Sequence, residues 1–247
     1  MKLRGALALG LLAVPTVFAA DVPVLAELFT SEGCSSCPPA DALLMKLDQL
    51  QPVAGAHVIV LSEHVDYWNS LGWRDPFSSA QFSRRQADYA RLLGSEVYTP
   101  QLVIDGRVQL NGSDGRDIQA AITRAAAKSK APVEVTASRE GGEAVVHLSV
   151  AALASGKSDV WVAIADESDE SSVNKGENSG RKLVHVAVVR SLSRVGSVSK
   201  SASFDQTVRL PLNPANHGGS RVVAWVASPS NPVLGAASTP LAVAATP

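Results

Sequence analysis

Cysteine, aromatic residues and unbalanced charge are all scarce in this chain of 247 residues. It has two cysteines, 5% aromatic residues, and 22 basic side chains against 23 acidic ones, which leaves a formal net charge of −1. A chain without excess positive charge lacks the electrostatic surface that attracts nucleic acid or an anionic membrane. We therefore expect neither of them as a partner.

Long apolar runs are also missing, except in the first 20 residues. Lys2 and Arg4 precede an apolar stretch at residues 7–14, and Ala19 and Ala20 are small residues of the kind that a signal peptidase accepts. The stretch is too short to anchor the chain stably in a bilayer, so it predicts a signal peptide over residues 1–20. A retained N-terminal anchor is the alternative. Cleavage would release a periplasmic or secreted protein without membrane contact, in a compartment where disulfides persist.

The two cysteines, Cys34 and Cys37, enclose two serines and follow an apolar run at residues 24–30. A helix-like segment begins directly after them at Pro38. A helix N-terminus favours a thiolate, which is the form that attacks a disulfide. A second nearby cysteine can then resolve the mixed disulfide. The pattern predicts Cys34 as an exposed nucleophile and Cys37 as the resolving thiol, with no cofactor required.

Such a protein would be a thiol–disulfide oxidoreductase acting on an exported thiol or disulfide protein, with an unidentified redox partner. Two other functions remain open. His64 follows a predicted strand and could complete a copper(I) site with Cys34 and Cys37, because thiolate and imidazole suit that ion. The protein would then bind or deliver copper. Alternatively, the disulfide is structural and the protein is a non-catalytic binding module, although so small a loop constrains the unfolded chain little.

The first half of the mature chain alternates predicted strands and helices. Its apolar periodicity and turn residues predict the following elements: a helix at 38–50, a buried strand at 58–61, a long connection at 64–77, a helix from Ser78 or Ser79 to Leu93, a hairpin at 98–110 that turns at Asp105-Gly106, and a helix at 116–127.

After residue 130 the pattern changes to short alternating strands. They are predicted at 133–136, 146–150, 160–165, 183–189, 204–210 and 222–227. Strands at this spacing, without a convincing helix, predict a mostly antiparallel β-sandwich domain over residues 131–247. Residues 166–182 are charged and contain glycine, which favours a solvated loop.

The order of elements over residues 21–130 resembles a thioredoxin-like α/β domain. This resemblance implies that Pro100, after Thr99, is a cis-proline facing the cysteines and that Thr99 contacts the substrate backbone. An ordinary trans proline at an edge strand is the alternative. Glu27 lies one residue further from Cys34 than the buried carboxylate that transfers protons in thioredoxins. It could serve that role, or it could point to a solvated edge.

Several longer segments also resemble a secreted bacterial family of unknown function, domain-of-unknown-function family 1223, which is classed as thioredoxin-like. They are residues 27–41, 65–68, 71–77, 98–101 and 176–181. The resemblance implies a fold but no established reaction, and it allows a functional role for residues 176–181. Gly33 stands where thioredoxins carry tryptophan, and Ser35-Ser36 brings no charge to the site, so the direction of electron transfer stays open.

More than half of the aromatic residues fall between residues 64 and 98. Phe77, Phe82 and Tyr89 have the spacing of packed side chains. Tyr67, Trp68 and Trp73 either belong to the same local core or form an apolar rim that holds a substrate, since tyrosine and tryptophan are enriched at interfaces.

Overall fold

The computed structural model of this protein describes residues 20–212, 219–228, 230 and 232–243. The predicted signal peptide lies outside these residues, apart from Ala20. Among the described residues, no helix combines the length and the apolar character needed to cross a membrane.

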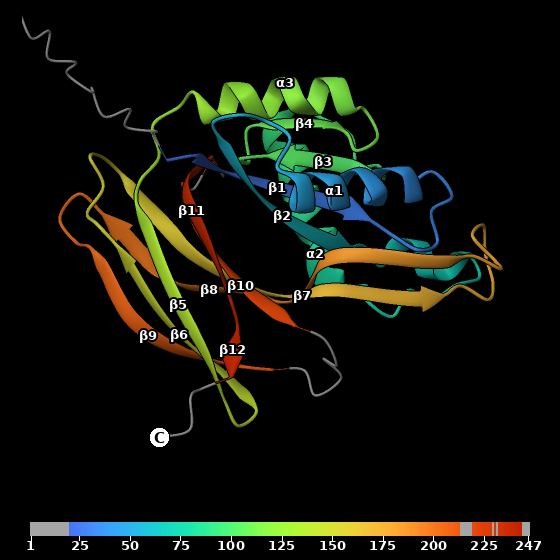
Figure 1. The fold of residues 1–247 in the computed structure, drawn as a ribbon. Coiled ribbons are helices and arrows are strands. Elements are labelled where there is room, and N and C mark those ends of the chain that lie inside the picture. The colour runs from blue at the N-terminus through green and yellow to red at the C-terminus, as the bar shows by residue number, and fades with distance from the viewer. Residues whose placement is uncertain (1–19, 213–218, 229, 231, 244–247) are drawn as a thin grey trace, which may run out of the picture.

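The fold is a mixed α/β structure dominated by a sheet of eight strands, which contains strands from both halves of the chain (Figure 1). Their order is β11-β10-β7-β8-β2-β1-β3-β4. β1 runs parallel to β2 and antiparallel to β3. The strands are β1 (Val22–Thr30), β2 (Ala56–His64), β3 (Gln101–Ile104), β4 (Val108–Asn111), β7 (Lys157–Ser172), β8 (Lys182–Ser199), β10 (Ser220–Ala227) and β11 (Val233–Pro240).

Helices cover both faces of the sheet around β1. Successive side chains of a strand point to opposite faces, so Leu28 and Phe29 contact different helices. α1 (Pro38–Leu50) and α3 (Gly115–Ala126) pack on the face of Leu28, whereas α2 (Ala80–Leu93) packs on the face of Phe29. This arrangement places the start of α1 at the carboxyl end of β1, next to the short helix η1 (Tyr67–Leu71) and its flanking loop.

The local signals in the sequence explain where these elements begin and end. α1 begins at Pro38, since N–H groups in a first helical turn have no helical partner and proline costs little there. Ser79 caps α2 by accepting a hydrogen bond from the N–H of Gln81, and Gly94 ends the helix with a φ of 65°. The predicted turn at Asp105-Gly106 joins β3 to β4. These predictions are confirmed.

A second sheet of four strands, in the order β12-β5-β6-β9, packs against the β7–β10 side of the large sheet. Their shared core contains Val146 and Leu148 of β6, Val160 and Val162 of β7, and Val226 of β10. All six strands predicted after residue 130 are present, but β11 and β12 were not predicted. The bounds are β5 (Val133–Glu140), β6 (Glu143–Val150), β9 (Phe204–Pro211) and β12 (Ala242–Val243).

The prediction of a solvated loop over residues 166–182 is wrong for residues 166–172, which form the end of β7. β7 and β8 make a long hairpin, and its tip reaches the end of the sheet where α1 begins (Figure 1). Asp166 and Asp169 can lie in a strand because both form ion pairs with Arg190 on the partner strand. Only residues 173–181 remain as the connection between the two strands.

The chain on either side of residue 130 is tightly joined. β2 pairs with β8, and Asp105 in the β3–β4 turn contacts three other segments. Its Oδ1 accepts a hydrogen bond from the N–H of Leu25, its Oδ2 pairs with Lys130, and its carbonyl accepts from the N–H of Val233. Strands from both sides of residue 130 therefore share one sheet. The domain boundary near residue 130 stays a prediction.

Candidate functional site

Cys34 and Cys37 form a disulfide between the end of β1 and the start of α1. Cys37 is the N-cap residue of α1, and its carbonyl accepts hydrogen bonds from the N–H groups of Ala40 and Asp41 at 2.8 and 3.1 Å. The Sγ of Cys34 lies 3.4 Å from the hydroxyl of Ser36. The disulfide thus lies directly at a helix N-terminus, where partial positive charge favours a thiolate after reduction.

The prediction that Cys34 is exposed is wrong, because Cys34 and Cys37 are both 0% exposed. The connection between β7 and β8 contacts the main chain beside them. The side-chain amide of Asn178 donates to the carbonyls of Glu32 and Cys34 at 2.8 and 2.9 Å. A segment more than 140 residues away in the sequence thus contacts Cys34, and no local pattern could have predicted that contact.

Thr99 and Pro100 lie around the same helix start. The Thr99–Pro100 peptide bond is cis, which confirms that prediction. The hydroxyl of Thr99 accepts a hydrogen bond from the indole N–H of Trp68 at 2.9 Å. A Cβ at Gly33 would lie 3.1 Å from the Cβ of Trp68, so Trp68 packs against the residue that precedes Cys34. The structure therefore brings Thr99 and Pro100 to the site of the cysteines.

The aromatic residues between 64 and 98 include a buried group and a group near the cysteines. Phe77, Phe82 and Tyr89 are buried, which confirms their prediction as packed side chains. Trp68 and Trp73 contact residues 31–37, the cysteine-bearing loop, whereas Tyr67 is 40% exposed.

Glu27 belongs to a different cluster on the α2 face of the sheet. Its carboxylate accepts hydrogen bonds from Arg85 and Tyr89 of α2, and Glu63 of β2 also lies against Arg85, at 3.4 Å. Burial raises the pKa of Glu63 well above its ordinary value, with Arg85 opposing and Glu27 adding to that effect. Glu27 is fully buried, so it does not point to a solvated edge, and it faces away from the helix that carries Cys37.

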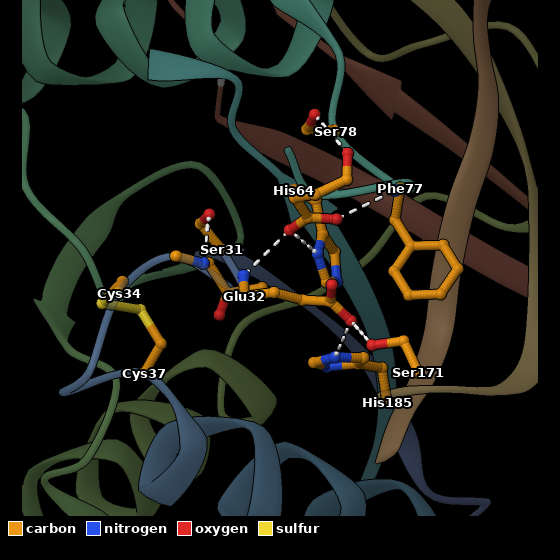
Figure 2. Close-up of polar contacts among 12 residues, drawn as sticks. Ser31, Glu32, Cys34, Cys37, His64, Phe77, Ser78, Ser171 and His185 are labelled. Carbon is orange, nitrogen blue, oxygen red and sulfur yellow. Dashed lines mark hydrogen bonds and ion pairs between the residues drawn. A yellow bond between two sulfur atoms is a disulfide. The ribbon is translucent and has the colours of Figure 1, made fainter. Parts of the chain in front are cut away.

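A second buried polar cluster lies next to the disulfide and was not predicted (Figure 2). At its centre, the carboxylate of Glu32 accepts hydrogen bonds from the indole of Trp73 at 2.8 Å and from Ser171 of β7. His185 of β8 lies with Nε2 at 3.4 Å from the same carboxylate. The backbone N–H of Glu32 donates to Asp75 at 2.8 Å. Glu32 thus connects the cysteine-bearing loop to the β7–β8 hairpin.

Asp41 extends this cluster into the first turn of α1. It accepts a hydrogen bond from the hydroxyl of Thr30 at 2.9 Å and faces Nδ1 of His185 at 3.6 Å. Burial raises the pKa of Asp41 above its ordinary value, although His185 and His64 oppose the change. A sequence signal did exist, since Glu32, Asp41 and Asp75 all lie in the segments that carry the family resemblance.

His64 and Asp75 form a buried pair, with Nδ1 of His64 at 2.7 Å from the Asp75 carboxylate. Burial alone would lower the pKa of His64, but Asp75, Asp41 and Glu32 together raise it above its ordinary value of 6.5. Burial alone would raise the pKa of Asp75, but His64 and the N–H groups of Glu32 and Phe77 lower it below 3.8.

The replacement Asp75→Asn should therefore have a pH-dependent effect on stability. The lowered pKa of Asp75 stabilises the fold above about pH 3.8, and the raised pKa of His64 stabilises it below about pH 6.5. The variant should lose about 1–3 kcal/mol near pH 5, and less as rising pH deprotonates His64. Urea unfolding at a series of pH values measures this. Asp205→Asn, in an exposed pair with His147, is the control and should lose little at any pH.

His64 does not join the cysteines. Its Nδ1 is paired with Asp75, and Glu32 lies between its ring and the disulfide (Figure 2). Within the described part of the chain, no three histidine, cysteine, aspartate or glutamate side chains are grouped so as to hold a metal ion. The candidate set of Cys34, Cys37 and His64 is thus not assembled in this disulfide-bonded structure.

Comparison with known proteins supplies a family but no reaction. Residues 25–227 match a family described as a protein of unknown function, DUF1223. The chain is also similar to the X-ray crystal structure of protein AGR_C_4864 from Agrobacterium tumefaciens, with 33% sequence identity and a TM-score of 0.67 over 93% of this chain and 98% of that chain. A search of curated proteins gives no match. The family match covers most of the chain and confirms the predicted resemblance to family 1223: this protein belongs to the DUF1223 family.

Proposed function

We propose that this protein is an exported thiol–disulfide oxidoreductase, periplasmic or secreted, that uses the Cys34–Cys37 disulfide. The observation that carries the proposal is the place of the disulfide at the N-terminus of α1, with Cys37 as the N-cap. A helix N-terminus stabilises the thiolate that forms on reduction, and this makes the disulfide easier to reduce.

The finer description of the fold belongs to the same proposal. The chain contains, in order, β1, the cysteine pair, α1, β2, α2, the cis Thr99–Pro100 bond, the β3–β4 hairpin and α3. We propose that they form a thioredoxin-like unit, and that the strands after residue 130 form a sandwich-like unit fused to it through the large sheet.

The reaction would be a reversible exchange in two steps. A partner thiolate attacks Sγ of Cys34, the Cys34–Cys37 bond breaks, and Cys37 leaves as a thiolate that takes up a proton. The partner's second thiolate then attacks the partner sulfur of the mixed disulfide and releases Cys34, which is also protonated. Two electrons pass from the partner dithiol to the protein, so the partner gains a disulfide and the protein gains two thiols.

A redox titration of the purified mature protein in glutathione or dithiothreitol buffers tests this proposal. We expect reversible reduction of the fully folded protein, with a potential above about −300 mV, in the range of catalytic disulfides. A potential well below that value would place the bond among inert structural disulfides and would favour the binding-module alternative.

Thiol labelling and copper addition complete the test. With limiting iodoacetamide, the reduced protein should be labelled at Cys34 well before Cys37, because Cys34 is the proposed nucleophile. Equal labelling would contradict the assigned roles. Stoichiometric binding of copper(I) to the reduced protein, combined with no exchange with thiol partners, would support copper delivery instead.

A further inference from the structure

Three main-chain polar groups beside Cys34 are hydrogen-bonded by side chains of one distant segment, and the carbonyl of Cys34 also accepts from the N–H of Cys37 at 3.2 Å. The side-chain amide of Asn178 donates to the carbonyls of Glu32 and Cys34, and the carboxylate of Glu177 accepts from the N–H of Ser35 at 3.0 Å. Both residues belong to the connection between β7 and β8. No hydrogen bond between the main chains of the two segments accompanies these contacts among the described residues.

These contacts have the chemistry of a bound peptide. The carboxamide of Asn178 is the same chemical group as a peptide bond, and the carboxylate of Glu177 accepts as a peptide carbonyl does. Residues 31–37 form turns between β1 and α1 rather than a strand, so a partner chain would bond to these groups singly, as Asn178 and Glu177 do. The carbonyls of Glu32 and Cys34 and the N–H of Ser35 therefore offer what an extended partner would use.

The surroundings fit a polypeptide partner. The side chains of Tyr67 and Leu71 on η1 are 40% and 60% exposed. A Cβ at Gly72, the residue after η1, would lie 3.6 Å from the backbone of Gly176. These two exposed side chains thus lie on the helix that borders residues 173–181, which we call the covering segment.

The covering segment is held at its base and touches the cysteine-bearing loop through side chains. The N–H of Val173 donates to the carbonyl of Arg181, and the N–H of Gly180 donates to the carbonyl of Val173. These two bonds close the tip of the hairpin into a compact unit. The hydrogen bonds described here between this unit and the cysteine-bearing loop all come from the side chains of Asn178 and Glu177. Moving the unit away from Cys34 would break these bonds and leave the two bonds at its base intact.

We propose that the surface formed by Glu32, Cys34 and Ser35 binds an extended polypeptide segment of the redox partner, and that Asn178 and Glu177 occupy this surface when the partner is absent. The inference rests on the proposed oxidoreductase function and names the class of its partner. The fully buried disulfide reacts only after residues 173–181 move away.

The first test measures how fast dithiothreitol reduces the disulfide in the full-length mature protein. Asn178→Ala removes two hydrogen bonds and should react about tenfold faster, and Glu177→Ala should react about threefold faster. Lys175→Ala changes an exposed side chain of the same segment and should react at the wild-type rate. Circular dichroism and thermal unfolding verify that each variant is folded. If burial of Asn178 makes its variant unstable, the exposed Glu177 still provides the test.

The second test asks whether the surface recognises peptide main chain. In a Cys37→Ala variant whose Cys34 carries a mixed disulfide with mercaptoethanol, a hexapeptide with one cysteine flanked by valines should displace the mercaptoethanol. The exchange forms a Cys34–peptide disulfide and releases mercaptoethanol. After correction for the same exchange with a free, blocked cysteine that lacks flanking residues, we expect the peptide to be favoured at least tenfold. N-methylation of its flanking peptide bonds should abolish this preference, because the donors to Glu32 and Cys34 are lost.

The outcomes separate this inference from the proposed function. Equal reduction rates in the wild type, Asn178→Ala, Glu177→Ala and Lys175→Ala would overturn the role of the covering segment, even if the redox titration supports an oxidoreductase. Equal exchange with the plain and N-methylated peptides would overturn the peptide surface. A disulfide that resists reduction in every folded variant would overturn both the inference and the proposed function.

Discussion

Replacing Arg85 by leucine is expected to lower the free energy of unfolding by about 3–5 kcal/mol, because it leaves buried carboxylates without their cation. Glu27 and Glu63 are both fully buried, and Arg85 of α2 lies against both of them. The guanidinium of Arg85 also lies over the rings of Trp161 and Trp225, at 5.6 and 5.2 Å from their centroids. Chemical denaturation of the purified variant measures the loss.

The effect of Arg85→Leu should also depend on pH. The pKa of Glu63 is already raised by burial in the wild type, so its contribution to stability is present below about pH 4.5 and is lost as pH rises through the raised value. Without the opposing cation that pKa should rise further, and the variant should therefore be much less stable at pH 8 than at pH 5.

Arg91→Leu is the matched control on the same helix. Arg91 pairs with Asp88, but both side chains are more than half exposed, so the variant should lose less than about 1 kcal/mol at either pH. Similar losses for Arg85→Leu and Arg91→Leu would contradict the assignment of Glu27 and Glu63 to a buried ion-pair cluster.

Replacing Gly235 by alanine is the second change with a large expected effect. A Cβ at this position of β11 would lie 2.0 Å from the carbonyl oxygen of Ala131, a distance that real structures do not tolerate. Ala131 is itself fixed, because its N–H donates to the carbonyl of Leu234 at 2.7 Å. The obstacle is therefore backbone rather than a flexible side chain, and two segments must shift apart.

We expect Gly235→Ala to cost about 3 kcal/mol, at the upper end of the usual range for overpacking. In a chain of this size the melting temperature should fall by roughly 2–4 °C for each kcal/mol. Gly142→Ala is the control, since a Cβ there meets nothing within 4 Å, and its melting temperature should stay close to that of the wild type. An unchanged melting temperature for Gly235→Ala would show that residue 131 and β11 are not packed as described.

The position of Gly235 also bears on the two units suggested by the sequence. Ala131 lies at the predicted boundary, in the segment that joins α3 to β5. That segment packs backbone to backbone against β11 rather than forming a free linker. Destabilising this contact should therefore weaken both sides of the chain together, and one unfolding transition is expected rather than two.

The local elements and the cysteine pair at the centre of the candidate site could be predicted from the order of the residues. The period of apolar residues placed α1 and α2, Ser79 and Gly94 marked the ends of α2, and Asp105-Gly106 marked the β3–β4 turn. These features depend on residues within one or two turns of each other, so a short window contains the whole signal. The cysteine pair was recognisable for the same reason.

The surroundings of the cysteines could not be predicted in this way, because they come from distant parts of the chain. Asn178 reaches the carbonyl of Cys34 from 144 residues away, and Ser171 and His185 reach Glu32 from the same hairpin. The prediction of an exposed Cys34 was wrong because exposure depends on such distant covering segments. Glu27, for which the sequence left proton transfer and a solvated edge open, is buried and pairs with Arg85 from α2. The pattern of a strand shows which face of the sheet a carboxylate points to. It does not show which cation pairs with that carboxylate, because the cation comes from a helix or strand far away in the sequence.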